Sequence, residues 1–199
     1  MRNADWAGAE RRLLATLRAC GRRAPVATAA RALSFGGEHG ALWLAAGLAG
    51  AAVDRERRTG WLRGTALIAG AHLVSMGVKR VVRRPRPGTV EYEPLVRTAG
   101  RHSFPSSHAT SAAAAAVAFG ALHPTGRRLA APAAAAMCLS RLVVGVHYPT
   151  DVAAGALLGA ATASLGRDWL RTAPRARGAV SGMVSGAVTA PRARGGRRG

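Results

Sequence analysis

The sequence is poor in the residues that metal sites and disulfide frameworks require. Its 199 residues include only two cysteines, Cys20 and Cys138, which are too few for either purpose. Cys138 lies inside an apolar run, as a small buried thiol does. Asp and Glu number 9 against 29 Lys and Arg, and no group of carboxylates is clustered as magnesium ligands are. We therefore expect no metal and no cofactor.

β-strand patterns and internal repeats are also missing, which favours an all-α fold. The length of 199 residues favours one domain. In place of strands, the chain has apolar runs separated by short polar turns, and 49% of its residues are hydrophobic. Ala and Gly are abundant, as in closely packed membrane helices. The pattern predicts a polytopic membrane helical bundle with five to six transmembrane helices.

Five of these helices are defined by clear apolar runs, over residues 40–53, 61–82, 105–122, 127–146 and 149–165. The first run is shorter than the ~20 residues that a span needs, so it must recruit its flanks or cross a thin part of the bilayer. Residues 1–38 form either an amphipathic surface helix or a weakly apolar first helix. We favour a weak span over residues 13–36, which gives six.

The net charge of +20 indicates an anionic partner, either membrane lipid or nucleic acid. Residues 170–199 are rich in Arg, Gly, Ala and Pro, which predicts a disordered basic tail after a membrane domain over 1–169. We expect this tail to contact anionic lipid and no specific nucleic acid. Both faces of the predicted bundle carry positive charge, so the positive-inside rule alone does not decide the orientation. The 79–105 loop has a reason for its arginines if it binds an anion, whereas the tail and the short turns have no other evident reason for theirs. We therefore expect the tail in the cytoplasm and the 79–105 loop outside the cell membrane. The N-terminus has no clean signal-peptide apolar region.

Three short polar motifs lie at the edges of the apolar runs. Residues 79–87 read Lys-Arg-Val-Val-Arg-Arg-Pro-Arg-Pro, residues 105–108 read Pro-Ser-Ser-His, and residues 140–151 begin with Ser-Arg and end with His-Tyr-Pro-Thr-Asp. Charged groups next to membrane segments are costly, which favours a functional role. Taken alone, the third motif also fits a snorkelling arginine and a helix-capping histidine. The single lysine, Lys79, lies in a chain that otherwise uses arginine, and the two are not interchangeable at a phosphate.

Together the motifs resemble the signature of the type 2 phosphatidic acid phosphatase (PAP2) superfamily. That signature is Lys, six residues, Arg-Pro; then Pro-Ser-Gly-His; then Ser-Arg, five residues, His, three residues, Asp. The resemblance extends over residues 39–166 in the order and spacing of the family, with Ser107 where Gly is usual. Three motifs in register are far more specific than one. The resemblance implies a membrane bundle of the PAP2/haloperoxidase type.

The resemblance also implies the roles of individual residues. His147 is expected to attack phosphorus and form a phosphohistidine, while Asp151 fixes the tautomer of its ring. His108 is expected to act as general acid and then as general base. Pro105 suits the first turn of a helix whose N-terminus faces the phosphate. The expected phosphate-binding residues are Lys79, Arg86, Ser106, Ser107 and Arg141.

The resulting hypothesis is a metal-independent phosphatase that hydrolyses a lipid phosphate or diphosphate of the phosphatidate, phosphatidylglycerophosphate or polyprenyl (di)phosphate type. One alternative is a polyprenyl-phosphoribose phosphate phosphatase in cell-wall precursor synthesis, by compositional analogy. A vanadium-dependent haloperoxidase fits less well, because those enzymes are large and soluble. The remaining alternative is a non-catalytic basic membrane protein that binds anionic lipid or nucleic acid. The sequence leaves the headgroup and the oligomeric state open.

Other polar residues near the motifs have simpler interpretations. Arg80, Arg83 and Arg84 form either a solvated basic rim or a patch that attracts an anionic headgroup. His72 lies inside an apolar helix and is expected to be packed and hydrogen-bonded. Gly155 and Gly159 are spaced for close contact with another helix.

Overall fold

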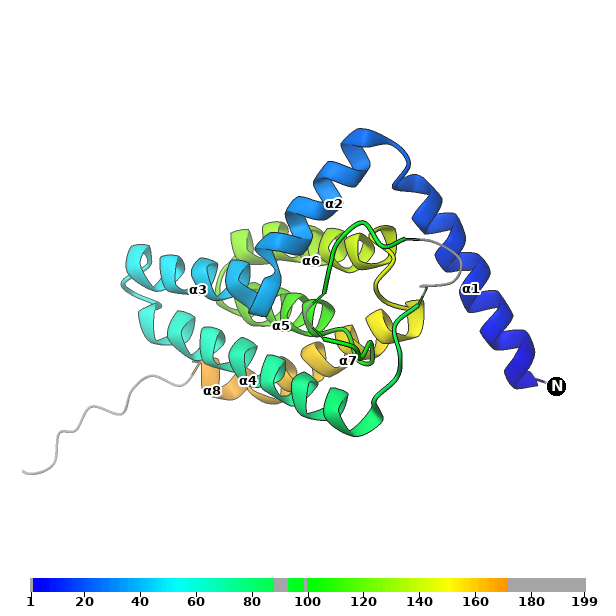
Figure 1. Ribbon diagram of the computed structural model, residues 1–199. Coiled ribbons are helices and arrows are strands. Elements are labelled where there is room, and N and C mark those ends of the chain that lie inside the picture. Colours follow the sequence, from blue (N-terminus) through cyan, green and yellow to red (C-terminus); the bar gives the residue numbers. More distant parts are fainter. Residues whose placement is uncertain (1, 88–92, 99, 172–199) are drawn as a thin grey trace, which may run out of the picture.

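The computed structural model describes residues 2–87, 93–98 and 100–171, and within them the regular elements are helices (Figure 1). The expectation of an all-α fold is therefore confirmed. The elements are α1 (Arg2–Cys20), α2 (Ala24–Gly36), the short 3-10 helix η1 (Glu38–Gly40), α3 (Ala41–Val53), α4 (Arg58–Val82), α5 (Ser107–Leu122), α6 (Pro124–Val143), α7 (Pro149–Leu165) and α8 (Arg167–Arg171).

Helix α6 ends at Val143, before the end of the apolar run that predicted a helix to residue 146. Gly145 has a φ of 77°, in the left-handed region that glycine adopts without strain. The N–H of Gly145 donates to the carbonyl of Leu142 (3.1 Å), and that of Val146 donates to the carbonyl of Arg141 (3.3 Å). These two bonds form a Schellman motif, which stops the helix and starts the loop that carries His147.

Helix α5 begins at Ser107, so the expectation that Pro105 lies in its first turn is wrong. Ser106 is the N-cap residue, with extended backbone angles, and its hydroxyl accepts the N–H of Ala109 (3.4 Å). A serine cap supplies an acceptor for one of the free N–H groups of the first turn. Pro105 therefore precedes the cap instead of opening the helix.

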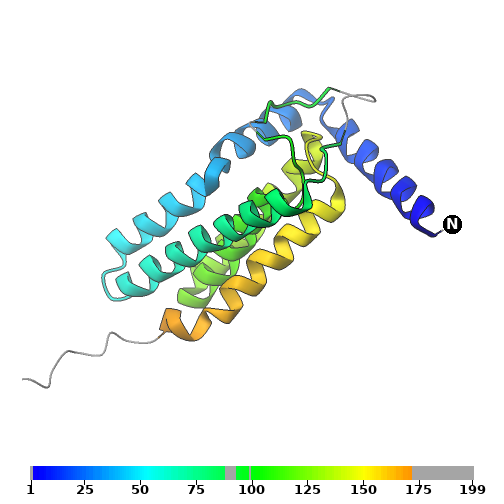
Figure 2. The ribbon, with the colours of Figure 1, turned by 60° about the horizontal axis from the view of Figure 1, so that its bottom comes forward.

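Two helices, α1 and α2, occupy the region where we favour a single weak span. They meet at residues 21–23, and Pro25 in the first turn of α2 cannot continue an earlier helix. Helix α1 leans away from the bundle (Figures 1 and 2). Helix α2 runs into α3 through a bend, where His39 (φ 52°) and Gly40 (φ 75°) have left-handed backbone angles.

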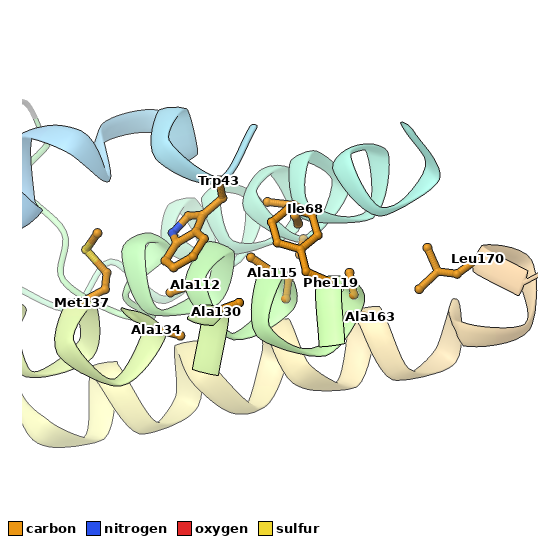
Figure 3. Close-up of a cluster of buried hydrophobic side chains, with 13 residues drawn as sticks. Trp43, Ile68, Ala112, Ala115, Phe119, Ala130, Ala134, Met137, Ala163 and Leu170 are labelled. Atoms are coloured by element: carbon orange, nitrogen blue, oxygen red, sulfur yellow. The ribbon is translucent and has the colours of Figure 1, made fainter. Parts of the chain in front are cut away.

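The core surrounds α5, which packs against α4, α6 and α7. The small side chains of α5 allow these neighbours to come close, and Ala112, Ala115 and Ala118 are fully buried. Larger apolar residues from the neighbouring helices, among them Ile68 and Met137, fill the remaining space (Figure 3). An interior of this kind is held together by dense packing.

Helices α5 and α7 approach each other most closely at Gly155 and Gly159. A β-carbon at Gly155 would clash with the carbonyl oxygen of Ser106, and one at Gly159 would clash with that of Thr110. Both carbonyls belong to the start of α5, so the expected close helix contact is confirmed. Because only glycine fits at these two positions of α7, the start of α5 can lie directly against its backbone.

Within the described residues, α4 is the one helix that is long and apolar enough to cross a membrane by length and composition. Helix α5 is apolar but shorter. Several large apolar side chains point outward, among them Leu73, Leu157 and Leu165, which are 68%, 71% and 88% exposed. An apolar exterior of this kind fits a lipid environment. The number of transmembrane helices stays a prediction.

The folded part extends slightly past the predicted domain boundary at residue 169. Leu170 in α8 is 3% exposed and belongs to the core cluster. The rest of the predicted basic tail, residues 172–199, lies outside the described residues.

Candidate active site

The three motifs meet at one end of the bundle. The N–H of Ser106, at the start of α5, donates to the carbonyl of Asp151 in the first turn of α7 (2.9 Å). Arg86, which follows α4 in the chain, donates from Nη1 to the carbonyl of Val146 (2.9 Å), in the loop between α6 and α7. Residues from three separate stretches of sequence therefore surround one small volume.

His147 lies between a cation and a carboxylate. Its Nε2 is 3.3 Å from Nη1 of Arg86, and its Nδ1 is 3.5 Å from Oδ2 of Asp151. A guanidinium can only donate, so Nε2 is the acceptor and the proton of the neutral ring is on Nδ1, facing the carboxylate. The lone pair of Nε2 is thus directed toward the cationic side of the site, as nucleophilic attack on a phosphate requires.

The pKa of His147 is strongly shifted by its surroundings. The side chain is 2% exposed, and burial lowers its pKa from 6.5 to about 3. The nearby Asp151 opposes this shift, whereas the positive charges of the surrounding Arg and Lys side chains increase it. The imidazole is therefore neutral at physiological pH, which is the form that can act as a nucleophile.

Ser34 of α2 connects the two other principal site residues, Arg141 and His108. Arg141 is 3% exposed, and its Nη1 donates to the hydroxyl of Ser34. The Nε2 of His108 lies 3.1 Å from the carbonyl oxygen of Ser34 and donates to it, since a carbonyl only accepts. Sequence reasoning missed Ser34, because a lone serine in a weakly apolar helix carries no signal.

Lys79 and Arg86 are held by backbone carbonyls of the loop that follows α4. Nζ of Lys79 donates to the carbonyl of His102 (3.4 Å), and Nε of Arg86 donates to that of Gly100 (2.8 Å). Within the described part of the chain, neither these two cations nor Arg141 forms an ion pair. Three cations with neutral partners form a region of positive potential that suits a phosphate.

The two serines of the second motif use their hydroxyls within the protein. Ser106 caps α5, as described above. Ser107, at the position where the family signature has Gly, shares a hydrogen bond of 2.9 Å with Ser75 of α4. The first N–H groups of α5 have no acceptor within the helix and carry its positive dipole end. These N–H groups, more than the hydroxyls, are available to an anion.

Arg84 is not a solvated rim residue, and that interpretation is wrong. Its Nη1 donates to Oδ1 of Asp151 (2.9 Å) and to the hydroxyl of Thr150 (2.7 Å), and its Nη2 donates to Oε2 of Glu10 (2.8 Å). Its guanidinium carbon lies 4.0 Å from the centroid of the Tyr148 ring. This contact has no signal in the sequence, because Glu10 lies far away in α1 and outside every motif.

His72 is packed and hydrogen-bonded, as expected. Its Nδ1 lies 3.0 Å from the hydroxyl of Ser111 of α5. No group of three or more His, Cys, Asp or Glu that could hold a metal ion occurs in the described residues.

A neutral histidine that is oriented by a carboxylate and faces a group of cations is chemically suited to phosphoryl transfer. Comparison with known proteins agrees with this class. The family model described as the PAP2 superfamily matches residues 60–175, which is more than half of the chain. The chain therefore belongs to the PAP2 superfamily and is a phosphatase.

Two curated relatives cover most of the chain. The decaprenylphosphoryl-5-phosphoribose phosphatase of Mycolicibacterium smegmatis is 47% identical over 143 residues, which are 72% of this chain and 78% of that protein. The protein of the same name from Mycobacterium tuberculosis is 43% identical over 136 residues, which are 68% of this chain and 76% of the relative.

A solved structure shares the fold. It is a transmembrane PAP2 type phosphatidylglycerolphosphate phosphatase from Bacillus subtilis, similar with a TM-score of 0.56 and 21% sequence identity. The similarity covers 85% of this chain and 98% of that one. The prediction of a PAP2-type helical architecture is thus confirmed at the level of the fold.

The contact between Ser107 and Ser75 predicts the effect of restoring the family residue. Ser107→Gly should lower stability by about 1 kcal/mol, the usual worth of one hydrogen bond, and should leave KM within about twofold of wild type because the backbone N–H remains. Ser75→Ala is the control, since it removes the same bond from the α4 side without changing α5, together with the bond of the Ser75 hydroxyl to the carbonyl of His72. Thermal unfolding and steady-state kinetics in detergent measure both effects. A large rise in KM in Ser107→Gly alone would show that the hydroxyl binds the phosphate.

Proposed function

We propose that the protein removes the 5-phosphate from a polyprenylphosphoryl-5-phosphoribose lipid. The observation that carries the phosphatase chemistry is the placement of His147, with Nε2 facing Arg86 and Nδ1 facing Asp151. The substrate class is supported by the two relatives at 43–47% identity, which cover two thirds or more of this chain. The choice therefore favours the phosphoribose alternative over phosphatidate and the other lipid phosphates.

The first step transfers the phosphoryl group to the protein. Nε2 of His147 forms a bond to phosphorus while the bond from phosphorus to the ribose oxygen breaks. His108 enters this step as the imidazolium, the form that a bound phosphate dianion favours. Its Nε2–H stays on the carbonyl of Ser34, and its Nδ1 donates the second proton to the ribose oxygen, which leaves His108 neutral. Asp151 stabilises the positive charge that develops on the ring of His147.

The second step regenerates the enzyme. His108, now neutral, takes a proton from water as the oxygen attacks phosphorus and the P–N bond breaks. Inorganic phosphate leaves, and His147 returns to its neutral form. Throughout both steps Lys79, Arg86 and Arg141 balance the charge of the equatorial phosphate oxygens. We propose that these side chains make a metal ion unnecessary.

The site lies at one end of the bundle, which we propose is the outer face of the cell membrane. In this arrangement α2 and α3 are the two halves of one bent span, α4 to α7 are four further spans, and α1 lies at the outer surface. The Arg-rich tail then lies in the cytoplasm, in accord with the positive-inside rule. Its contact with anionic lipid is proposed from composition alone.

Orientation can be tested with reporter fusions that report cytoplasmic or external location. A fusion after Gly166 should report the cytoplasm, and one inserted between residues 88 and 100 should report the outside. An equal result at the two positions, or the reversed pair, would contradict the proposed orientation.

A phosphate-release panel tests the substrate. Purified protein in detergent with EDTA should be compared on polyprenylphosphoryl-5-phosphoribose, phosphatidate, phosphatidylglycerophosphate and polyprenyl mono- and diphosphates. We expect kcat/KM for the phosphoribose lipid to exceed the others by about 10-fold or more, the scale set by recognition of sugar hydroxyls. Preference for any other lipid would exclude this substrate, and a strict magnesium requirement would exclude the metal-free mechanism.

Alanine variants of His147 and His108 should lose activity at different steps of the reaction. His147→Ala should abolish labelling of the protein by a rapidly quenched phosphate-labelled substrate. His108→Ala should still be labelled by a substrate with a good leaving group, and the label should accumulate because water lacks its base. Asp151→Asn should lower kcat by a factor on the order of 10²–10⁴, by analogy with the loss of the orienting carboxylate in other histidine sites. Near-normal turnover in His147→Ala would refute the mechanism.

A further inference from the structure

We propose that Arg84 and Glu10 are positioning residues for the reaction. Together they connect α1 to the carboxylate of Asp151, so that the docking of α1 on the bundle sets how well His147 is oriented. The inference rests on the proposed role of His147 as the nucleophile and is independent of which lipid is the substrate.

Arg84 fixes the rotation of the Asp151 carboxylate. Oδ1 of Asp151 accepts from Arg84 (2.9 Å), and Oδ2 accepts from the N–H of Tyr148 (2.8 Å). With both oxygens held, Oδ2 stays on the side that faces Nδ1 of His147. Asp151 is fully buried, and a buried carboxylate needs such partners to remain ionised.

The contacts of Arg84 argue against a role in binding phosphate. Its two terminal nitrogens donate to the carboxylates of Asp151 and Glu10 and to Thr150. The flat face of its guanidinium lies over the ring of Tyr148. The fork geometry of an arginine suits bridging of two carboxylates, and a lysine cannot reproduce it.

Glu10 supplies a cap for α7 from the other end of the sequence. Its Oε1 accepts the N–H of Thr150 (2.9 Å) and the hydroxyl of the same residue, while its Oε2 accepts from Arg84. Thr150 lies in the first turn of α7, where N–H groups have no intrahelical acceptor and a negative charge is favoured. The helix that carries Asp151 is thereby anchored to α1.

An apolar contact completes the docking of α1. Leu14 is 1% exposed and packs with Ala109, Leu142 and Val152, which belong to α5, α6 and α7 near the site. Glu10, 9% exposed, is four residues earlier and lies on the same face of α1. One ionic and one apolar anchor therefore seat α1 against the end of the bundle that carries His147.

The first test measures the rate of His147 phosphorylation in a single turnover at saturating substrate, with the lipid that the enzyme hydrolyses fastest. Arg84→Gln should lower this rate about 10- to 100-fold and leave KM within about threefold, because Arg84 acts through Asp151 and not on the phosphate. Glu10→Gln should lower the phosphorylation rate less, by about 3- to 10-fold, because the amide oxygen of the glutamine still accepts from Thr150. Arg83→Gln is the matched control: the charge change is the same on an exposed neighbour, and its rate should stay within about twofold.

The decisive test is the combination with Asp151→Asn. If Arg84 acts through the carboxylate, adding Arg84→Gln to Asp151→Asn should lower the phosphorylation rate by less than about threefold, since the carboxylate with which Arg84 interacts is already gone. If the fold-losses in phosphorylation rate of the two single variants multiply in the double variant, the proposal is overturned. That result means that their free-energy effects add, as expected of an independent structural role. A KM effect in Arg84→Gln with an unchanged phosphorylation rate would assign Arg84 to substrate binding and would also overturn it.

Two further variants keep the proposal open to refutation if Arg84→Gln does not fold. Arg84→Lys keeps the charge but cannot bridge two carboxylates, so its phosphorylation rate should fall to a value between wild type and Asp151→Asn. Leu14→Ala weakens the docking of α1 without altering a charge, and it should also slow phosphorylation. Wild-type rates in both variants would overturn the proposal. Absence of a labelled His147 in the wild type would refute the phosphohistidine mechanism itself, whereas a different preferred lipid would leave this inference intact.

Discussion

The close approach of α5 and α7 is the contact on which the site depends. Gly155 and Gly159 leave no room for a side chain opposite the carbonyls of Ser106 and Thr110, so the two helix starts lie backbone to backbone. The hydrogen bond from the Ser106 N–H to the Asp151 carbonyl joins them at the end of the bundle where the three motifs meet. The second and third motifs therefore meet because these three close backbone contacts hold the helices together, as in other tightly packed helix pairs.

Electrostatics then decide what this end of the bundle can bind. Arg141 is buried, Lys79 and Arg86 are held by backbone carbonyls, and the nearby carboxylate of Asp151 is already engaged by Arg84. Transferring a charge from water into such a site is expensive unless an opposite charge accompanies it. A phosphate dianion brings that opposite charge, which is why a site rich in arginine and poor in carboxylates favours phosphoryl chemistry.

The two N-terminal helices contribute contacts to the site although they lie outside the three motifs. Helix α1 leans away from the other helices, yet Glu10 and Leu14 seat it against α7 and its neighbours. Helix α2 contributes in a different way, because both the hydroxyl and the carbonyl of Ser34 serve the site. Two helices that precede the family motifs thus complete the surroundings of His108 and His147.

The sequence by itself determined the helical class, the family and the positions of the three motifs, because apolar periodicity and exact motif spacing are local properties of the chain. It also identified the Gly155 and Gly159 contact, since small residues four apart mark close helix packing. It did not place the end of α6, because a Schellman turn at Gly145 interrupts an apolar run without any change in composition.

The network around Arg84 and the contacts of Ser34 were decided only by tertiary structure. Glu10 and Asp151 are 141 positions apart, and nothing in the local pattern of either residue indicates the other. The arginines at 80, 83 and 84 look alike in sequence, but among the described residues only Arg84 meets two carboxylates. The chain turns just before it, at Arg83, which has a left-handed φ of 52°. Long-range pairing of this kind depends on how the helices pack, which local sequence does not encode.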